Sequence, residues 1–321
     1  MQVSDRQPIQ LRPFVTQAVW GGRRLVQSYG IDPQGLPNAA EAWVLSAHPR
    51  GNSAAETGPF AGQSIGQLFA ARPELFGSNC AGAQCAEGMD SFPVLVKLID
   101  ALQDLSVQVH PRDNDPVLLP GEAGKTECWY ILDTAPGAKL YLGFRQAITP
   151  AQFAAAIADN TIMDYVASYD VSPGEFYFIP AGTLHAIGAG VLLAEVQQNS
   201  DTTYRIYDYN RLQNGQPRQL HVEQAKAVTD LLPYEPPQQK PGLLCDCEYF
   251  TVEERDDRSG FSGEAGDESF VHLLFLEAGD GAKLTWEGTK TPVAKGGSVL
   301  VPAGAGEFRV DGDVRALVTS V

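Results

Sequence analysis

Apolar and polar residues alternate along two short stretches of the chain, and this pattern predicts two β-strands. Over residues 105–110 every second side chain is aliphatic, so Gln108 and His110 point to the same side. By the same rule Lys125 and Glu127 share one face of the second stretch. If the two strands are neighbours, an amide oxygen, an imidazole and a carboxylate face one common space.

A third stretch, residues 172–187, reads as a turn, a strand, a tight turn and a second strand, with His185 just beyond the second turn. His185 completes a set of nitrogen and oxygen donors with His110 and Glu127, and Gln108 is a weak fourth ligand. Such donors suit a borderline divalent cation, zinc above all, and leave a position open as catalytic zinc sites do. Each side chain alone is more often structural than a ligand, so the prediction depends on the combination.

Helical signals interrupt this strand pattern at three places. Ser64 and Thr149 are each followed three residues later by a glutamine, which is the capping box that opens a helix. The helix that begins after Thr149 is expected to cover residues 150–158, and a further short helix is expected over residues 163–168. The predicted helical insertions cover residues of about 64–76, 150–168 and 221–228.

The last part of the chain repeats a local pattern of the middle part. Residues 173–182 and 295–304 both read as a glycine turn, a strand and the sequence Pro-Ala-Gly. In this register His185 aligns with Glu307, and no Gln-x-His pair lies upstream of Glu307 in this half. The repeat predicts a second unit of the same shape that has no metal ligands and packs against the first unit or against another subunit.

Composition limits the partners and the setting of the protein. The formal net charge of −16 argues against nucleic acid or an anionic membrane as a partner. Five cysteines, an odd number in 321 residues, do not read as a disulfide framework, and Cys245 and Cys247 lack the partner pair of a zinc ribbon. The N-terminus has no apolar signal segment and no run has the length of a membrane helix, so a soluble cytoplasmic protein is expected.

Four longer motifs carry a resemblance to a known family. In chain order they are LSVQVHP, GKTECWYIL, FIPAGTLHAIGAG and VQQNSDTTYRIYDYNR. They resemble the type I mannose-6-phosphate isomerases (phosphomannose isomerases), in particular the short bacterial form of this group within the cupin superfamily. The similarity begins at Val19, continues through residues 41–48 and 92–100, and fades after about residue 230.

The resemblance implies a mainly β fold of two cupin-type jelly-roll barrels with a few added helices. The first domain, residues 1–232, is expected to bind the metal and carry the catalytic residues. Residues 233–241, which contain four prolines, are expected to form a linker. Residues 242–321 are expected to form a C-terminal jelly roll without metal ligands.

The activity that the resemblance implies is the interconversion of mannose 6-phosphate and fructose 6-phosphate. The implied ligands of one zinc ion per chain are Gln108, His110, Glu127 and His185. The metal would bind the sugar oxygens while a base moves a proton between C1 and C2. Both a monomer and a homodimer are compatible with the sequence.

Two carboxylates match the positions from which a base acts in this family, Glu195 and Asp201. Glu195 is favoured slightly because it lies in an apolar strand, where desolvation would raise its pKa, whereas Asp201 lies in a polar turn. Either residue could instead orient a ligand. Three histidines that match no ligand position are interpreted as structural: His48, His221 and His272.

Three cations are candidates for contacts with the phosphosugar substrate. By their motifs Lys125 and Arg205 lie close to the metal, Lys125 to polarise an oxygen or contact phosphate, and Arg205 to donate hydrogen bonds to the substrate. Lys97 interrupts a buried strand and needs a partner. That partner is either an internal carboxylate or a substrate anion, with the carboxylate preferred.

Two other functions remain open at this level. A cupin oxygenase could use a similar scaffold with iron or manganese, although Gln108, the cations and the lack of a His-x-His pair argue against it. A phosphosugar-binding cupin sensor would keep Lys125 and Arg205. Replacing Glu195 or Asp201 discriminates, because a sensor keeps its affinity and has no turnover to lose.

Overall fold

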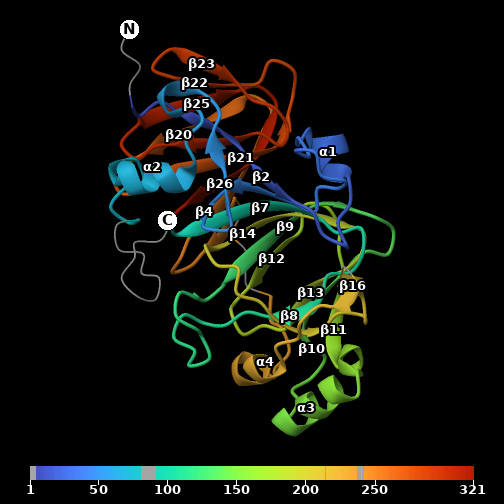
Figure 1. Ribbon diagram of the computed structural model, residues 1–321. Helices are drawn as coiled ribbons and strands as arrows, with labels where there is room; N and C mark the ends of the chain where they lie inside the picture. The colour runs from blue at the N-terminus through green and yellow to red at the C-terminus, as the bar shows by residue number, and fades with distance from the viewer. Residues whose placement is uncertain (1–4, 81–91, 214, 237–239, 241) are drawn as a thin grey trace.

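The structure, a computed structural model, describes residues 5–80, 92–213, 215–236, 240 and 242–321. Strands dominate, and most of them form two barrels, each built from two antiparallel sheets. In Figure 1 the barrel that contains the C-terminal strands lies at the top, in orange and red, and the barrel of the middle part of the chain lies below it. The predicted fold class, mainly β with cupin-type barrels, is confirmed.

The first barrel joins a six-stranded and a five-stranded sheet. In spatial order the six-stranded sheet consists of β12 (Phe176–Ile179), β9 (Glu127–Thr134), β14 (Val191–Gln198), β7 (Val94–Asp100), β3 (Glu41–Leu45) and β2 (Phe14–Thr16). The five-stranded sheet consists of β11 (Val166–Asp170), β10 (Lys139–Phe144), β13 (His185–Ile187), β8 (Val107–Val109) and β15 (Tyr204–Tyr207). Side chains from both sheets form one core between them, including Trp129, Leu142 and Leu193.

The two faces of the six-stranded sheet are buried against different neighbours. Along β14, Leu193 belongs to the core of the first barrel. Leu192 and Val196, on the opposite face of the same strand, belong to the core between the two barrels. The register of β14 against β7 places Glu195 directly opposite Lys97, on the interior face of the barrel. The strand pattern thus delivers polar side chains into the barrel while its other face holds the two barrels together.

The second barrel also has two sheets, but it takes strands from both ends of the chain. Its seven-stranded sheet consists of β18 (Leu243–Asp246), β19 (Thr251–Asp257), β26 (Val314–Ser320), β21 (Val271–Ala278), β24 (Ser298–Val301), β1 (Ile9–Arg12) and β6 (Ala54–Ala55). Its four-stranded sheet consists of β20 (Gly260–Ala265), β25 (Gly306–Asp311), β22 (Lys283–Trp286) and β23 (Thr289–Pro292). The sheet therefore includes N-terminal residues that the sequence assigned to the first domain.

The helices lie outside the barrels (Figure 1). They are α1 (Arg24–Tyr29), α2 (Ile65–Ala71), α3 (Pro150–Ala158) and α4 (Val222–Val228), with short 3-10 turns η1 (Gly58–Phe60), η2 (Pro73–Leu75) and η3 (Ile162–Asp164). Ser64 and Thr149 accept hydrogen bonds from the third residue of α2 and α3, so both predicted capping boxes are confirmed. Among the described residues, none of these helices has the length and apolar character that crossing a membrane requires.

The second helix predicted over residues 163–168 is wrong. The chain makes only the 3-10 turn η3 there and then enters β11, which pairs with β10 at the edge of the five-stranded sheet. Val166 is buried against α3 and its neighbours, and Tyr169 pairs with Leu140. A helix of six residues is unstable by itself, whereas β-branched and aromatic residues suit the edge of a sheet.

The predicted linker begins as a packed segment. Pro233 forms a β-bridge with Gly143, and the hydroxyl of the buried Tyr234 donates to the Phe178 carbonyl oxygen at 2.8 Å. Residues 237–239 and 241 of this segment lie outside the described residues, as do residues 81–91. Two short hairpins, β4 (Ala47–His48) with β5 (Gly51–Asn52) and β16 (Leu212–Gln213) with β17 (Gln216–Pro217), complete the fold.

Candidate active site

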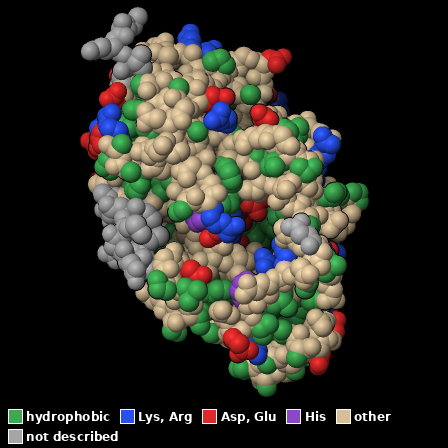
Figure 2. Space-filling view, viewed as in Figure 1, with side chains coloured by type: hydrophobic (Ala, Val, Ile, Leu, Met, Phe, Trp, Pro, Cys, Tyr) green, Lys and Arg blue, Asp and Glu red, His purple; other side chains and the backbone are tan. Residues whose placement is uncertain are grey.

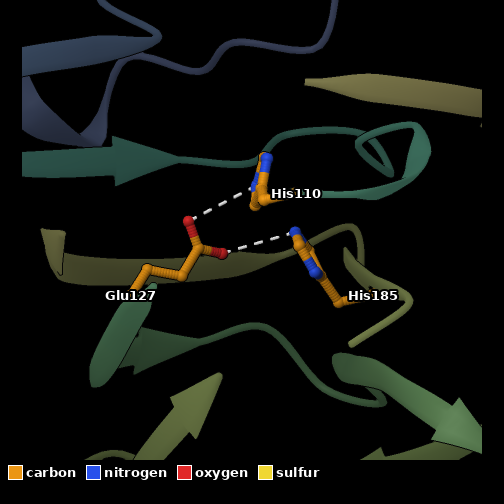
Figure 3. A group of neighbouring side chains, drawn as sticks. All are labelled: His110, Glu127 and His185. Carbon is orange, nitrogen blue, oxygen red and sulfur yellow. Dashed lines mark ion pairs between the residues drawn. The ribbon is translucent and has the colours of Figure 1, made fainter. Parts of the chain in front are cut away.

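Three buried side chains from both sheets of the first barrel meet in its interior (Figure 3). His110 follows β8 and His185 opens β13, both in the five-stranded sheet, whereas Glu127 opens β9 in the six-stranded sheet. The two strands that carry Gln108 and Glu127 are therefore not neighbours, contrary to the arrangement considered from the sequence. They lie in different sheets, and the shared space is the interior of the barrel.

The geometry of this triad fits a divalent cation. One ligand atom from each residue lies within 4.8 Å of the others. Glu127 Oε2 is 3.5 Å from His110 Nε2, and Glu127 Oε1 is 3.3 Å from His185 Nε2. The other ring nitrogens donate to backbone carbonyls, His110 Nδ1 to Thr202 at 2.8 Å and His185 Nδ1 to Thr183 at 2.9 Å. Because a carbonyl only accepts, these bonds fix the tautomer that turns each Nε2 lone pair towards the triad.

Burial sets the protonation of the triad. It lowers the pKa of His185 to about 4 and that of His110 well below 6.5, so both rings are neutral at pH 7. Burial raises the pKa of Glu127 to about 7, although Lys125 opposes this shift. Both oxygens of the Glu127 carboxylate are buried: Oε2 pairs with the Lys125 ammonium, and Oε1 has no hydrogen-bond donor in the described part of the chain. A divalent cation could be coordinated by the Glu127 carboxylate and by the Nε2 lone pairs of the two histidines. The donors present therefore fit the predicted metal.

Gln108 and Lys125 border the triad. Gln108 is the direct cross-strand partner of His185, and its Nε2 lies 3.4 Å from His185 Nε2. Its Oε1 instead accepts from the Ser106 hydroxyl at 3.1 Å, so the amide must turn over before the oxygen can act as a ligand. The buried Lys125 Nζ lies 2.7 Å from Glu127 Oε2 and 3.1 Å from His110 Nε2. The ligand role of Gln108 stays a prediction.

Glu195 is fully engaged by its neighbours inside the barrel. Its Oε1 accepts from Lys97 Nζ at 3.0 Å, and its Oε2 accepts from Trp129 Nε1 at 2.8 Å. Burial alone would raise the pKa of Glu195, but Lys97 and Lys125 outweigh that effect and lower this pKa to about 2. The expectation of a raised pKa is therefore wrong. The partner of Lys97 is an internal carboxylate, which was the preferred interpretation from the sequence.

Asp201 lies in the loop between β14 and β15, and two residues from the β4–β5 hairpin hold it. Arg50 forms an ion pair with its Oδ2, and His48 Nε2 is 3.4 Å from its Oδ1. The His48 contact, helped by the charge of Arg50, holds the pKa of Asp201 well below its usual range. Sequence reasoning missed Arg50 and treated His48 as structural, because 151 residues separate Arg50 from its partner.

Arg205 extends from β15 next to Gln108 on β8. Its Nε donates to the Ser106 hydroxyl at 3.0 Å, and the same hydroxyl donates to Gln108. Its guanidinium also donates to the Gln219 carbonyl oxygen at 3.0 Å, and its backbone N–H lies 3.3 Å from His221 Nδ1. Ser106, which the sequence did not single out, therefore connects Arg205 with the border of the triad.

A single cavity of about 1120 Å³ brings these side chains together. Its lining includes seven of the nine predicted site residues: Lys97, Gln108, Lys125, His185, Glu195, Asp201 and Arg205. His110 and Glu127 lie just behind the lining and are buried. Figure 2 shows a hollow in the middle of this face, with basic, acidic and histidine side chains gathered around it. Such a cavity is large enough for a sugar phosphate.

The fold and the site together define a class: a two-barrel cupin protein with a buried His–Glu–His group that could hold a metal ion, beside a cavity lined by several charged side chains. The family model described as phosphomannose isomerase type I, catalytic domain, matches residues 9–130 of this chain. Mannose-6-phosphate isomerase ManA from Bacillus subtilis strain 168 is 35% identical over 326 residues, which cover 98% of this chain and 98% of ManA. The chain therefore belongs to the type I phosphomannose isomerase family.

Solved structures agree with this assignment. The crystal structure of mannose 6-phosphate isomerase from Bacillus subtilis superimposes with a TM-score of 0.85 at 34% identity, covering 98% of this chain and 99% of that one. A zinc-bound mannose 6-phosphate isomerase shares the fold with a TM-score of 0.77 at 17% identity, covering 97% of this chain and 98% of its own. The resemblance inferred from the motifs is confirmed, but the expectation that it fades after about residue 230 is wrong, because the similarity covers 98% of the chain.

Proposed function

We propose that this protein is a zinc-dependent isomerase that interconverts mannose 6-phosphate and fructose 6-phosphate by proton transfer through an enediol. The observation that carries the proposal is the buried triad of His110, Glu127 and His185 at the base of a polar cavity, in a chain that matches family members end to end. An aldose–ketose isomerisation needs a site that binds two adjacent oxygens and a base beside the carbons that carry them.

The residues that would hold zinc are the triad, with Gln108 beside it. When bound, zinc supplies a Lewis acid that polarises the sugar oxygens and stabilises the negative charge that develops on them. Lys125 Nζ, 2.7 Å from Glu127, places a second positive charge next to the same oxygens. Arg205 donates from the neighbouring strand and orients the hydroxyl groups of the sugar. Trp129 also lines the cavity, and its ring packs roughly perpendicular to the ring of His185.

We assign the base to Asp201 rather than to Glu195. Both oxygens of Glu195 are held by donors that are themselves buried, Lys97 and Trp129, so a proton that reached it would break a buried ion pair. Asp201 lines the cavity, and its side chain is 31% exposed, so it can exchange a proton without such a loss. Its neighbour Thr202 accepts from His110, which ties the Asp201 loop to the triad.

Metal removal tests the proposed function. We expect the purified protein to convert mannose 6-phosphate into fructose 6-phosphate, to lose this activity after chelation and to regain it with zinc, because the triad itself carries no positive charge and the nearby Lys125 is already paired with Glu127. Elemental analysis of the untreated protein gives the number of zinc ions per chain. A folded, zinc-loaded protein without turnover would refute the isomerase and leave a phosphosugar sensor.

A matched pair of histidine variants separates loss of metal from loss of fold. His185 and His272 are both buried, but His272 lies in β21, outside the triad. We expect His185→Gln to lower the zinc content and the activity together, and His272→Gln to keep the zinc content of the unmodified protein. Equal zinc content in the two variants would contradict the assignment of the triad.

A further inference from the structure

The mouth of the cavity carries an ion pair whose two partners come from distant segments. Arg50 extends from the β4–β5 hairpin and Asp201 from the loop between β14 and β15, and both line the cavity. The side chain of Arg50 is 75% exposed. Ion pairs in contact with solvent are weak because water and salt screen them. This pair can therefore open when a stronger anionic partner arrives.

Asp201 keeps a second partner when Arg50 leaves. The Arg50 backbone N–H lies 3.2 Å from His48 Nδ1, which as an acceptor leaves the ring hydrogen on Nε2, 3.4 Å from Asp201 Oδ1. The His48 ring is itself fixed edge-on against Trp43, with ring centres 5.7 Å apart. The carboxylate thus contacts a packed histidine ring and an exposed cation.

The other cations that line the cavity are less exposed than Arg50 and are held by ion pairs or hydrogen bonds within the protein. Lys97 and Lys125 are buried in ion pairs with Glu195 and Glu127. Arg218 pairs with the buried Asp208 through two hydrogen bonds, of 2.7 and 2.5 Å. Arg205 is half-buried and donates to Ser106 and to a backbone carbonyl. Among the cavity cations in the described part of the chain, Arg50 is the exposed one.

From this arrangement we infer that Arg50 binds the phosphate group of the substrate at the cavity mouth by exchanging Asp201 for phosphate. The inference rests on the proposed function, since C1 and C2 would lie between the triad and Asp201, and the phosphate on C6 would extend outward, towards the exposed Arg50 side chain. A guanidinium donates two parallel hydrogen bonds to a phosphate, which a carboxylate paired through one oxygen does not match. The exchange selects phosphorylated over neutral sugars.

The exchange has a second effect inside the cavity. Once Arg50 pairs with phosphate, Oδ2 of Asp201 loses its cation while His48 still holds Oδ1. The carboxylate then becomes a stronger proton acceptor at the moment when the substrate is seated. An exposed local cation is also needed for capture, because the net charge of −16 repels a phosphate dianion over the rest of the surface.

Steady-state kinetics of Arg50→Gln, with Arg258→Gln as the matched control, test the inference. Arg258 is exposed in the second barrel and lies on another surface, away from the cavity. Because both residues are arginines, the two substitutions change the net charge by the same amount. We expect Arg50→Gln to raise KM for mannose 6-phosphate about tenfold, to change kcat by less than about threefold and to flatten the dependence of kcat/KM on salt. The KM of Arg50→Lys is expected to lie between those of the unmodified protein and Arg50→Gln. The control is expected to behave as the unmodified protein.

Other outcomes overturn the inference. An unchanged KM with unchanged salt dependence in Arg50→Gln, or the same changes in Arg258→Gln, would do so. A tenfold rise of KM in Arg218→Gln but not in Arg50→Gln would move phosphate binding to the opposite wall. A thermal-shift series with inorganic phosphate and with mannose needs no turnover: phosphate is expected to stabilise Arg50→Gln less than the unmodified protein, and mannose equally. Failure of the inference can therefore be distinguished from failure of the proposed isomerase activity.

Discussion

Asp201 and Glu195 carry the same charge at pH 7, but their surroundings give them different roles. Glu195 sits between Lys97 and Trp129 inside the barrel, where each charge depends on the other. Asp201 sits at the cavity mouth between His48 and an exposed arginine. A buried ion pair stabilises the fold, whereas a partly exposed carboxylate that lines the cavity can exchange protons.

This difference predicts opposite effects of neutralising the two carboxylates. Glu195→Gln leaves the ammonium of Lys97 buried without a counter-charge and is expected to lower the free energy of unfolding by about 3–5 kcal/mol. Asp201→Asn is expected to cost about 1 kcal/mol or less in stability but to lower kcat by about 10²–10⁴-fold, because it removes the proposed base. Urea unfolding and turnover measured on the same samples give both quantities.

The control for this pair is the double variant Lys97→Met with Glu195→Gln. Removing both charges leaves no uncompensated ion, so the double variant is expected to be more stable than Glu195→Gln alone. The assignment of the base would be wrong if Asp201→Asn kept the kcat of the unmodified protein while folded Glu195→Gln lost it.

His272 gives the protein a predictable sensitivity to acid. It is buried between the barrels, and its Nε2 lies 2.8 Å from Ser298 Oγ, whose single hydrogen is donated to the Val44 carbonyl oxygen. Nε2 is therefore the donor, and Nδ1 has no partner in the described part of the chain. Burial lowers the pKa of His272 from 6.5 to about 3. A proton on Nδ1 would be buried without an acceptor.

The sign of the pH effect follows from this lowered pKa. Between about pH 6.5 and pH 3 the unfolded chain binds a proton at His272 that the folded chain does not, so acid lowers stability. The contribution is complete above pH 6.5 and falls by up to about 1.4 kcal/mol per pH unit below it. We expect urea midpoints of His272→Gln to fall less between pH 6.5 and pH 4.5 than those of the unmodified protein. Parallel curves for the two proteins would contradict this.

At the scale of single elements, the sequence predicted what depends on near neighbours. The capping boxes at Ser64 and Thr149 satisfy backbone groups within one turn, so α2 and α3 were predicted with correct starts. The alternation around Gln108 and Glu127 gave the interior faces of β8 and β9. The alternation did not predict which sheet each strand joins, because it indicates the face on which a side chain lies but not the neighbouring strand.

Elements whose stability comes from distant partners were predicted less well. Strand β11 depends on pairing with β10, and its own sequence did not distinguish it from a short helix. The ion pair of Arg50 and Asp201 joins a hairpin near the start of the chain to a loop near residue 200. The candidate metal ligands were recognisable because each sits in a motif of its own, whereas this pair forms only in the folded barrel.

At the scale of the whole molecule, the two barrels share one hydrophobic core. Ile9 on β1 pairs with Leu300 on β24, and the same core includes Val96 and Leu98 from the first barrel and Leu317 from the second. The division into residues 1–232 and 242–321 stays a prediction about domains. The first strand of the chain, however, pairs with β24 in the seven-stranded sheet, so the second barrel is incomplete without the N-terminal strand.

This shared core predicts that damage at the N-terminal strand reaches the active site in the other barrel. Ile9 is fully buried, and Ile9→Ala is expected to lower the free energy of unfolding by about 2–4 kcal/mol through the cavity it leaves. Because the core joins both barrels, isomerase activity and far-UV circular dichroism should be lost at the same, lower urea concentration. Leu232→Ala, which truncates an exposed leucine, is the matched control and should leave both midpoints unchanged. If activity in Ile9→Ala survived to the midpoint of the unmodified protein while the dichroism fell earlier, the barrels would unfold independently, and the shared core would be an area of contact rather than a source of cooperativity.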